Sequence, residues 1–160
     1  GFDRVVNIIS RLVKDGLHVH LYILGSGPEE NNLKEQIIKL NLEKHVTLTG
    51  YQLNPYKYLS KMDLFVCASY AEGFSTAATE ALILGIPVCT VKVSGMKEML
   101  GNDEYGIITE NNDDALYEGL YKLVSNPKLL EHYRVKASER GKDFKTEETV
   151  LKVEEMLLKL

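Results

Sequence analysis

The chain has 160 residues, of which 44% are hydrophobic and 26% are charged. This composition is that of an ordinary globular protein with its own core, and it excludes disordered and fibrous proteins. The net charge of −4 is not accompanied by a cluster of Lys and Arg, so the sequence does not predict a nucleic-acid partner.

Predicted helices and strands alternate along the chain. Residues 2–13 have apolar side chains at helical spacing, and residues 17–24 form a predicted strand that ends in a glycine turn. The alternation continues with a helix over 29–40, a strand over 46–49, a helix over 56–61, a strand over 64–68, a helix over 76–84, a strand over 87–91, a short helix over 96–100 and a strand over 106–109. Further helices are predicted over 113–124, 127–140 and 146–160.

This order of elements predicts an α/β fold. Strands that alternate with helices form parallel βαβ units, whose right-handed crossovers place helices on both faces of one sheet. We therefore expect residues 1–160 to form a single domain, with a doubly wound, Rossmann-like parallel sheet of about five strands and extra C-terminal helices. Pro127 fits the first turn of its helix, and Gly141 is predicted to end that helix as a left-handed cap.

The loop after the strand at residues 64–68 is the strongest candidate site, because ligands bind at the carboxyl ends of the strands in such a sheet. Gly73 lets the backbone approach a ligand closely, and the free N–H groups of residues 74–77 would form a positive helix terminus that attracts phosphate. Glu72 and Glu80 could then reach hydroxyl groups on either side of that phosphate. A sugar diphosphate has this pattern.

Simpler interpretations of the same residues stay open. Glu72 can be a solvated loop carboxylate and Glu80 an exposed helix residue, while Ser75 and Thr76 are ordinary N-cap residues. Pairs of glutamates eight positions apart recur elsewhere in the chain. The spacing of Glu72 and Glu80 is therefore informative only in its sequence context.

That context resembles the Glu-x7-Glu signature of the family 4 retaining glycosyltransferases, also called glycosyl transferases group 1, whose fold is GT-B. The signature matches Glu72-Gly73-Phe74, Glu80-Ala81 and Gly85-Ile86-Pro87-Val88. Other stretches agree in the family's order over about residues 1–125, namely 1–3, 24–28, 48–51 and 62–66.

The resemblance implies that the chain is the C-terminal, donor-binding half of a two-domain enzyme that transfers a sugar from a nucleotide diphosphate. Glu72 would be the catalytic-site carboxylate that faces the donor sugar, and Glu80 would hold the ribose hydroxyls. Retention would follow from same-face attack, and no metal or other cofactor is expected because basic side chains and a helix terminus offset the diphosphate charge. The implied donor-binding residues are Gly25, Tyr51, Gln52, Gly73, Phe74, Ser75, Thr76 and Glu80.

The resemblance also places some of the family's parts upstream of Gly1. These parts are the first strand, the Arg and Lys that clamp the diphosphate, and the N-terminal domain that holds a glycan or lipid-linked acceptor. The chain by itself is therefore expected to bind its donor weakly and not to turn over. Because the family's first strand lies inside the sheet, its loss predicts a gap, a shifted strand order or self-association through the truncated sheet.

Two other functions stay open at this point. A non-transferase GT-B enzyme, such as a sugar-nucleotide epimerase, would need an additional acid–base pair across the cleft. A doubly wound ligand-binding module, such as a receiver-like domain, would need an acidic cluster where the chain has Gly25-Ser26-Gly27-Pro28. This turn also lacks the third glycine of a dinucleotide fingerprint.

The remaining residues that could carry chemistry have plain explanations. Cys67 and Cys89 lie in apolar runs without metal or redox spacing and are predicted to be buried, reduced thiols. His18 and His20 share a strand face but lack a third ligand, which favours half-buried strand positions over a metal site. The apolar runs are too short to cross a bilayer and no secretory signal is present, so the prediction is a cytoplasmic protein, peripheral at the membrane in its full-length form.

Overall fold

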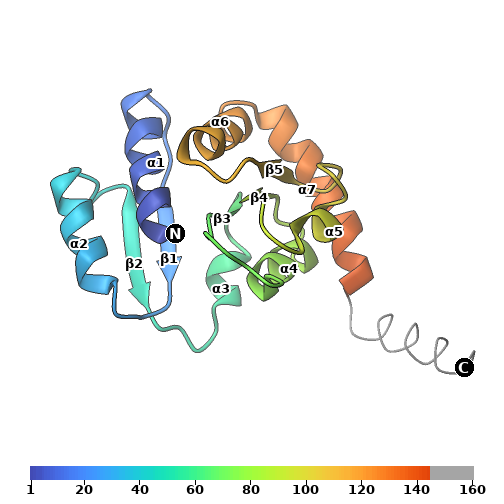
Figure 1. Cartoon of the computed structure of the whole chain (residues 1–160), viewed down its shortest axis with the longest axis horizontal. Coiled ribbons are helices and arrows are strands. Elements are labelled where there is room, and N and C mark those ends of the chain that lie inside the picture. The colour runs from blue at the N-terminus through green and yellow to red at the C-terminus, as the bar shows by residue number, and fades with distance from the viewer. Residues whose placement is uncertain (145–160) are drawn as a thin grey trace, which may run out of the picture.

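A computed structural model describes residues 1–144, and the helix predicted over 146–160 lies outside them. The described residues alternate between helices and parallel strands as the sequence predicts (Figure 1). In chain order the elements are α1 (Phe2–Lys14), β1 (Leu21–Leu24), α2 (Glu30–Lys39), β2 (Val46–Gly50), α3 (Tyr56–Leu59), β3 (Phe65–Cys67), α4 (Thr76–Ile83), β4 (Val88–Val91), α5 (Met96–Leu100), β5 (Ile107–Thr109), α6 (Asp113–Val124), α7 (Pro127–Gly141) and the 3-10 turn η1 (Lys142–Phe144).

The five strands are all parallel, but they form two sheets instead of one. β1 pairs with β2, with Leu21 opposite Val46, and a separate sheet has the order β3-β4-β5. Within the described residues no strand joins β1 to β3. The expectation of about five parallel strands is therefore confirmed, and so is the expectation of a gap in the sheet.

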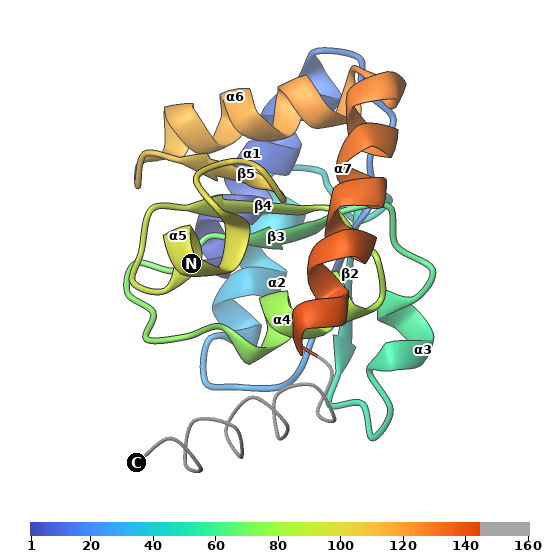
Figure 2. The same ribbon diagram turned by 90° about the vertical axis from the view of Figure 1, so that its right-hand side faces the viewer.

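Helices cover both faces of the strands, which gives two hydrophobic cores. On one face, α1 packs against α2 and α6, and its buried residues include Val6, Ile8 and Leu12. On the other face, α4, α5 and α7 enclose a second cluster around Leu82 and Met99. Figure 2 shows β3 and β4 between α6 and α4. The predicted α/β arrangement with helices on both faces is confirmed.

Gly141 does not have the predicted role of a left-handed cap. The residue is the last one of α7, its φ is not positive, and the chain continues directly into η1. A Cβ atom at this position would lie 2.2 Å from the carbonyl oxygen of Leu82. Gly141 is therefore needed because α7 approaches the backbone of α4 closely, which no pattern within one helix can show.

The first strand is shorter than predicted, and this changes the interpretation of two histidines. β1 begins at Leu21, so His18 and His20 precede it, and both are exposed instead of half-buried. The His20 ring packs against Tyr22 in a tilted arrangement, and its Nε2 atom lies 2.8 Å from the Thr47 hydroxyl. Separately, none of the helices in residues 1–144 combines the length and apolarity that a bilayer crossing requires.

Candidate functional site

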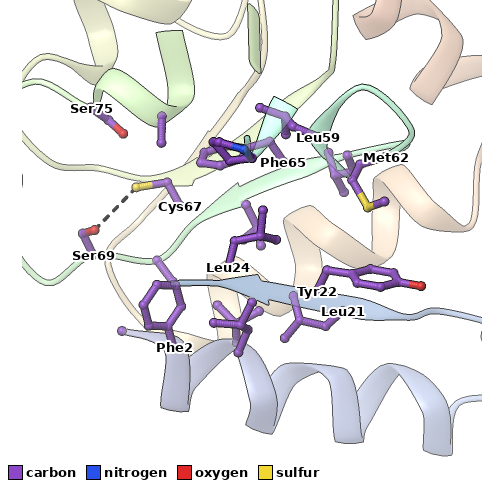
Figure 3. A pocket seen from close by; sticks show the side chains of 18 of the residues that line it. Phe2, Leu21, Tyr22, Leu24, Leu59, Met62, Phe65, Cys67, Ser69 and Ser75 are labelled. Carbon is purple, nitrogen blue, oxygen red and sulfur yellow. Dashed lines mark hydrogen bonds between the residues drawn. The ribbon is translucent and has the colours of Figure 1, made fainter. Parts of the chain in front are cut away.

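A cavity of about 520 Å³ lies between β1 and β3 and extends to the carboxyl ends of these strands (Figure 3). Apolar side chains line its walls, with Leu21 and Leu24 from β1 and Phe65 from β3. Glu72 and Glu80 also line the cavity, and over residues 1–144 its lining contains no Lys or Arg. The cavity thus joins the gap in the sheet to the loop that the sequence indicates as a site.

Ser75 fixes the start of α4 at this cavity. Its backbone is extended, with φ −81° and ψ 102°, and its hydroxyl accepts a hydrogen bond of 3.3 Å from the amide of Ala78. Ser75 is only 5% exposed and lines the cavity, whereas Thr76 is exposed and begins the helix itself. The N-cap interpretation of Ser75 is confirmed, and the positive end of α4 borders the cavity.

Arg4 of α1 anchors the other end of the same loop. Its side chain is 3% exposed. The guanidinium donates to the Ala68 carbonyl at 3.0 Å and pairs with Asp113 at 2.7 Å. It also donates to Asn111, whose side-chain amide donates at 3.4 Å to the carbonyls of residues 69 and 70. Arg4 is not among the residues predicted from the sequence, although a charged residue on the apolar face of the first helix is a visible signal.

Gly73 and Phe74 pack against a second loop instead of lining the cavity. A Cβ atom at Gly95, whose φ is 78°, would lie 2.8 Å from the carbonyl oxygen of Gly73 and 3.3 Å from the Phe74 ring. The Phe74 side chain is 54% exposed, and a Cβ atom at Gly73 would meet no protein atom within 4 Å. The backbone of Gly73 is therefore open to close approach by another molecule.

Glu80 is held by a residue of a different helix. The Tyr56 hydroxyl of α3 donates a hydrogen bond of 3.0 Å to Glu80 Oε1. This bond and the negative charge of the carboxylate raise the pKa of Tyr56 above its usual value. The Glu80 carboxylate therefore reaches the cavity with one oxygen already engaged.

Gly25, Tyr51 and Gln52 lie at the carboxyl ends of β1 and β2, and they are absent from the cavity lining. The Gly25 amide donates to the Gly50 carbonyl at 2.9 Å, and the Gln52 side chain donates to the Thr49 carbonyl at 2.8 Å. The Tyr51 side chain is 74% exposed. The structure thus brings Glu72, Ser75 and Glu80 to one cavity. Gly25, Tyr51 and Gln52 lie outside its lining, and their contribution to binding stays a prediction.

Both cysteines are free and buried, as the sequence predicts. Burial, with a smaller contribution from the charge of Asp103, raises the pKa of the Cys89 thiol to about 12. Cys67 Sγ lies 3.6 Å from the hydroxyl of Ser69. In the part of the chain that the structure describes, no three His, Cys, Asp or Glu side chains gather into a metal-binding group.

Sequence comparison identifies the family of the chain. The family profile described as glycosyl transferases group 1 matches residues 1–141. A 4-alpha-N-acetylgalactosaminyltransferase of Campylobacter jejuni, which acts on a diphospho-undecaprenol-linked saccharide by its name, is 38% identical over 142 residues. A capsular polysaccharide biosynthesis glycosyltransferase of Staphylococcus aureus, CapM, is 30% identical over 133 residues. These matches cover 88% and 82% of this chain but only 38% and 35% of the relatives.

Solved structures show the same fold. TarM of S. aureus, in a complex with UDP, has a TM-score of 0.85 and 27% identity, with 94% of this chain and 31% of TarM covered. The pneumococcal O-GlcNAc transferase GtfA, solved with UDP and GlcNAc, has a TM-score of 0.87 and 22% identity, with 99% of this chain and 33% of GtfA covered. The likeness confirms the expected GT-B type of fold.

Proposed function

Because the chain belongs to the glycosyl transferases group 1 family, we propose that it is the donor-binding domain of a retaining glycosyltransferase. The donor is a nucleotide-diphosphate sugar, held between Glu72 and Glu80 at the positive end of α4. One observation carries this proposal: both carboxylates line a single cavity whose rim is the helix start capped by Ser75. An anionic ligand is stabilised there by the free backbone N–H groups of the first helical turn.

Each part of the donor has a matching group in this arrangement. The backbone at Gly73 and the first amides of α4 take the diphosphate, and Glu80 accepts hydrogen bonds from the two ribose hydroxyls. Glu72, which is half-buried, faces the sugar and is the residue we assign to the catalytic site. Since a helix terminus supplies the positive charge, the mechanism we propose uses no metal, and attack from the leaving-group side retains the configuration.

The acceptor binds outside this chain in our proposal, because the chain spans 38% and 35% of the two relatives named above. Their names indicate polysaccharide and lipid-linked saccharide synthesis, which favours a glycan or lipid-linked acceptor on a second, N-terminal domain. An enzyme that uses such acceptors would work at the cytoplasmic face of a membrane. These relatives also favour transfer over the epimerase and ligand-binding alternatives.

The gap between β1 and β3 supports one more proposal, that the sheet takes up an added parallel strand there. Successive backbone amides of a strand point to opposite sides. In β1 the amide of Leu21 donates to the β2 side, so the amide of Tyr22 faces the gap. In β3 the amide of Phe65 donates to the β4 side, so the amide of Val66 faces the gap. The occupant we propose is an extended apolar segment that leads into Gly1, which lies beside Ala68 at this end of the gap. The alternative is that a second copy of the chain pairs with the same edges of β1 and β3.

Calorimetric titration with UDP, GDP and their sugars tests the donor proposal. Weak but saturable binding to one nucleotide is expected, and Gly73→Ala should lower its affinity at least about fivefold, since the methyl group would meet the ligand but no protein atom. Glu80→Gln should lower it by roughly tenfold. Glu35→Gln, an exposed carboxylate of α2, is the matched control and should leave affinity unchanged. No binding of any nucleotide at millimolar concentration would contradict the proposal.

A further inference from the structure

Tyr56 is a polar residue for which the sequence suggested no role, yet it contacts the candidate site from outside. It is the first residue of α3, it is not among the residues that line the cavity, and its hydroxyl donates to Glu80 Oε1 at 3.0 Å. Glu80 itself lines the cavity from the second turn of α4. Tyr56 therefore contacts the carboxylate without lining the cavity itself.

The hydrogen bond from Tyr56 restricts the Glu80 carboxylate, and this matters for binding a vicinal diol such as the two ribose hydroxyls. An ionised carboxylate has about four lone-pair positions on two oxygens, and a vicinal diol needs two acceptors at once. The hydrogen bond from Tyr56 engages one oxygen and leaves the remaining lone pairs free to accept from a ligand. Glu80 is half-buried, and among residues 1–144 no other side-chain hydrogen bond to it is present.

We propose that Tyr56 is a positioning residue that orients Glu80 toward the ribose hydroxyls of the nucleotide. This inference rests on the proposed function, because it assigns the ribose contact to Glu80. The hydroxyl stays protonated, and therefore a donor, throughout the neutral range, since Glu80 raises the pKa of Tyr56. This role of Tyr56 also makes α3, which follows the carboxyl end of β2, part of the nucleotide site.

The test compares two ligands on two proteins. Affinities of the unaltered chain and of Tyr56→Phe are measured for UDP and for 2′,3′-dideoxy-UDP by ligand-observed NMR or calorimetry. Tyr56→Phe should weaken UDP binding by about three- to tenfold, the effect of one hydrogen bond, and change dideoxy-UDP binding less than about twofold. Equal losses for both ligands, or no loss for UDP, would overturn the inference, because neither result depends on the diol.

Two further variants separate this role from a structural one. Tyr58→Phe, on the same helix, should leave both affinities unchanged. Glu80→Gln should reduce UDP affinity less in the Tyr56→Phe background than in the unaltered chain, since the two residues act on one contact. Strictly additive effects would overturn the inference while leaving the proposed function intact. If the unaltered chain binds no nucleotide, the proposed function itself fails, and the inference with it.

Discussion

Arg4 and Arg11 show how burial decides what a residue contributes. Both lie on α1 and both pair with an aspartate in the first turn of α6 at 2.7 Å. The Arg4 side chain is 3% exposed, whereas that of Arg11 is 42% exposed. Arg4 also donates to the buried Ala68 carbonyl, so its loss leaves that carbonyl without its side-chain donor.

This contrast gives a prediction for stability. Arg4→Met should lower the free energy of unfolding by about 2 kcal/mol or more, because the buried Ala68 carbonyl and the side-chain oxygen of Asn111 lose their charged partner. Arg11→Met, which removes an exposed pair of the same length and a stacking contact with Tyr117, should cost about 1 kcal/mol or less. Urea denaturation measures both. Equal costs would show that the Arg4 network does not hold the loop.

Cys89 gives the residue-scale prediction for pH dependence. Its thiol has a pKa of about 12 in the native chain against its usual value of 9.0, so above pH 9 the unfolded chain loses a proton that the native chain keeps. Stability therefore falls as pH rises from 9 toward 12, by roughly 1 kcal/mol per pH unit from this residue. Cys89→Ala should remove this loss, so its stability relative to the unaltered chain rises across that range. A pH-independent difference would contradict the assignment.

At the scale of elements, backbone atoms of α4 leave no room for a side chain at Gly141 of α7. A Cβ atom at Gly141 would meet the Leu82 carbonyl and Ile83 Cα, neither of which can move without a shift of a helix. Gly141→Ala should therefore destabilise the chain by about 2 kcal/mol, although Ala favours helix by ~1 kcal/mol. Gly27→Ala adds the same methyl group in open space and should be nearly neutral. Thermal unfolding compares the two, and a stabilised Gly141→Ala would show that the helices have room to separate.

The elements and part of the site could be predicted from sequence because their signals are local. Helical spacing gave α1, and the order of strands and helices gave the parallel arrangement. The resemblance indicated the loop with Glu72 and Glu80, which the structure brings to one cavity. Contacts between distant segments were missed, since the roles of Arg4, Tyr56 and Gly141 depend on residues 24 to 109 positions away.

At the scale of the whole molecule, the divided sheet leaves two strand edges facing one apolar cavity. Hydrogen exchange tests this division residue by residue. The amides of Tyr22 and Val66 face the gap and should exchange about tenfold or more faster than those of Ile23 and Cys67, which lie in the same strands and face β2 and β4. Equal protection of all four amides, with a concentration-dependent mass, would show that a second copy closes the gap.

The central claim is that a nucleotide binds where the carboxylates of Glu72 and Glu80 flank the start of α4. An amide-resolved NMR titration of the chain with UDP and GDP tests it most directly. The account predicts saturable shift changes for the amides of residues 72–76 and 80, with the larger effects at the free N–H groups of the first helical turn. Changes confined to residues outside 69–80, or none at millimolar nucleotide, would contradict it.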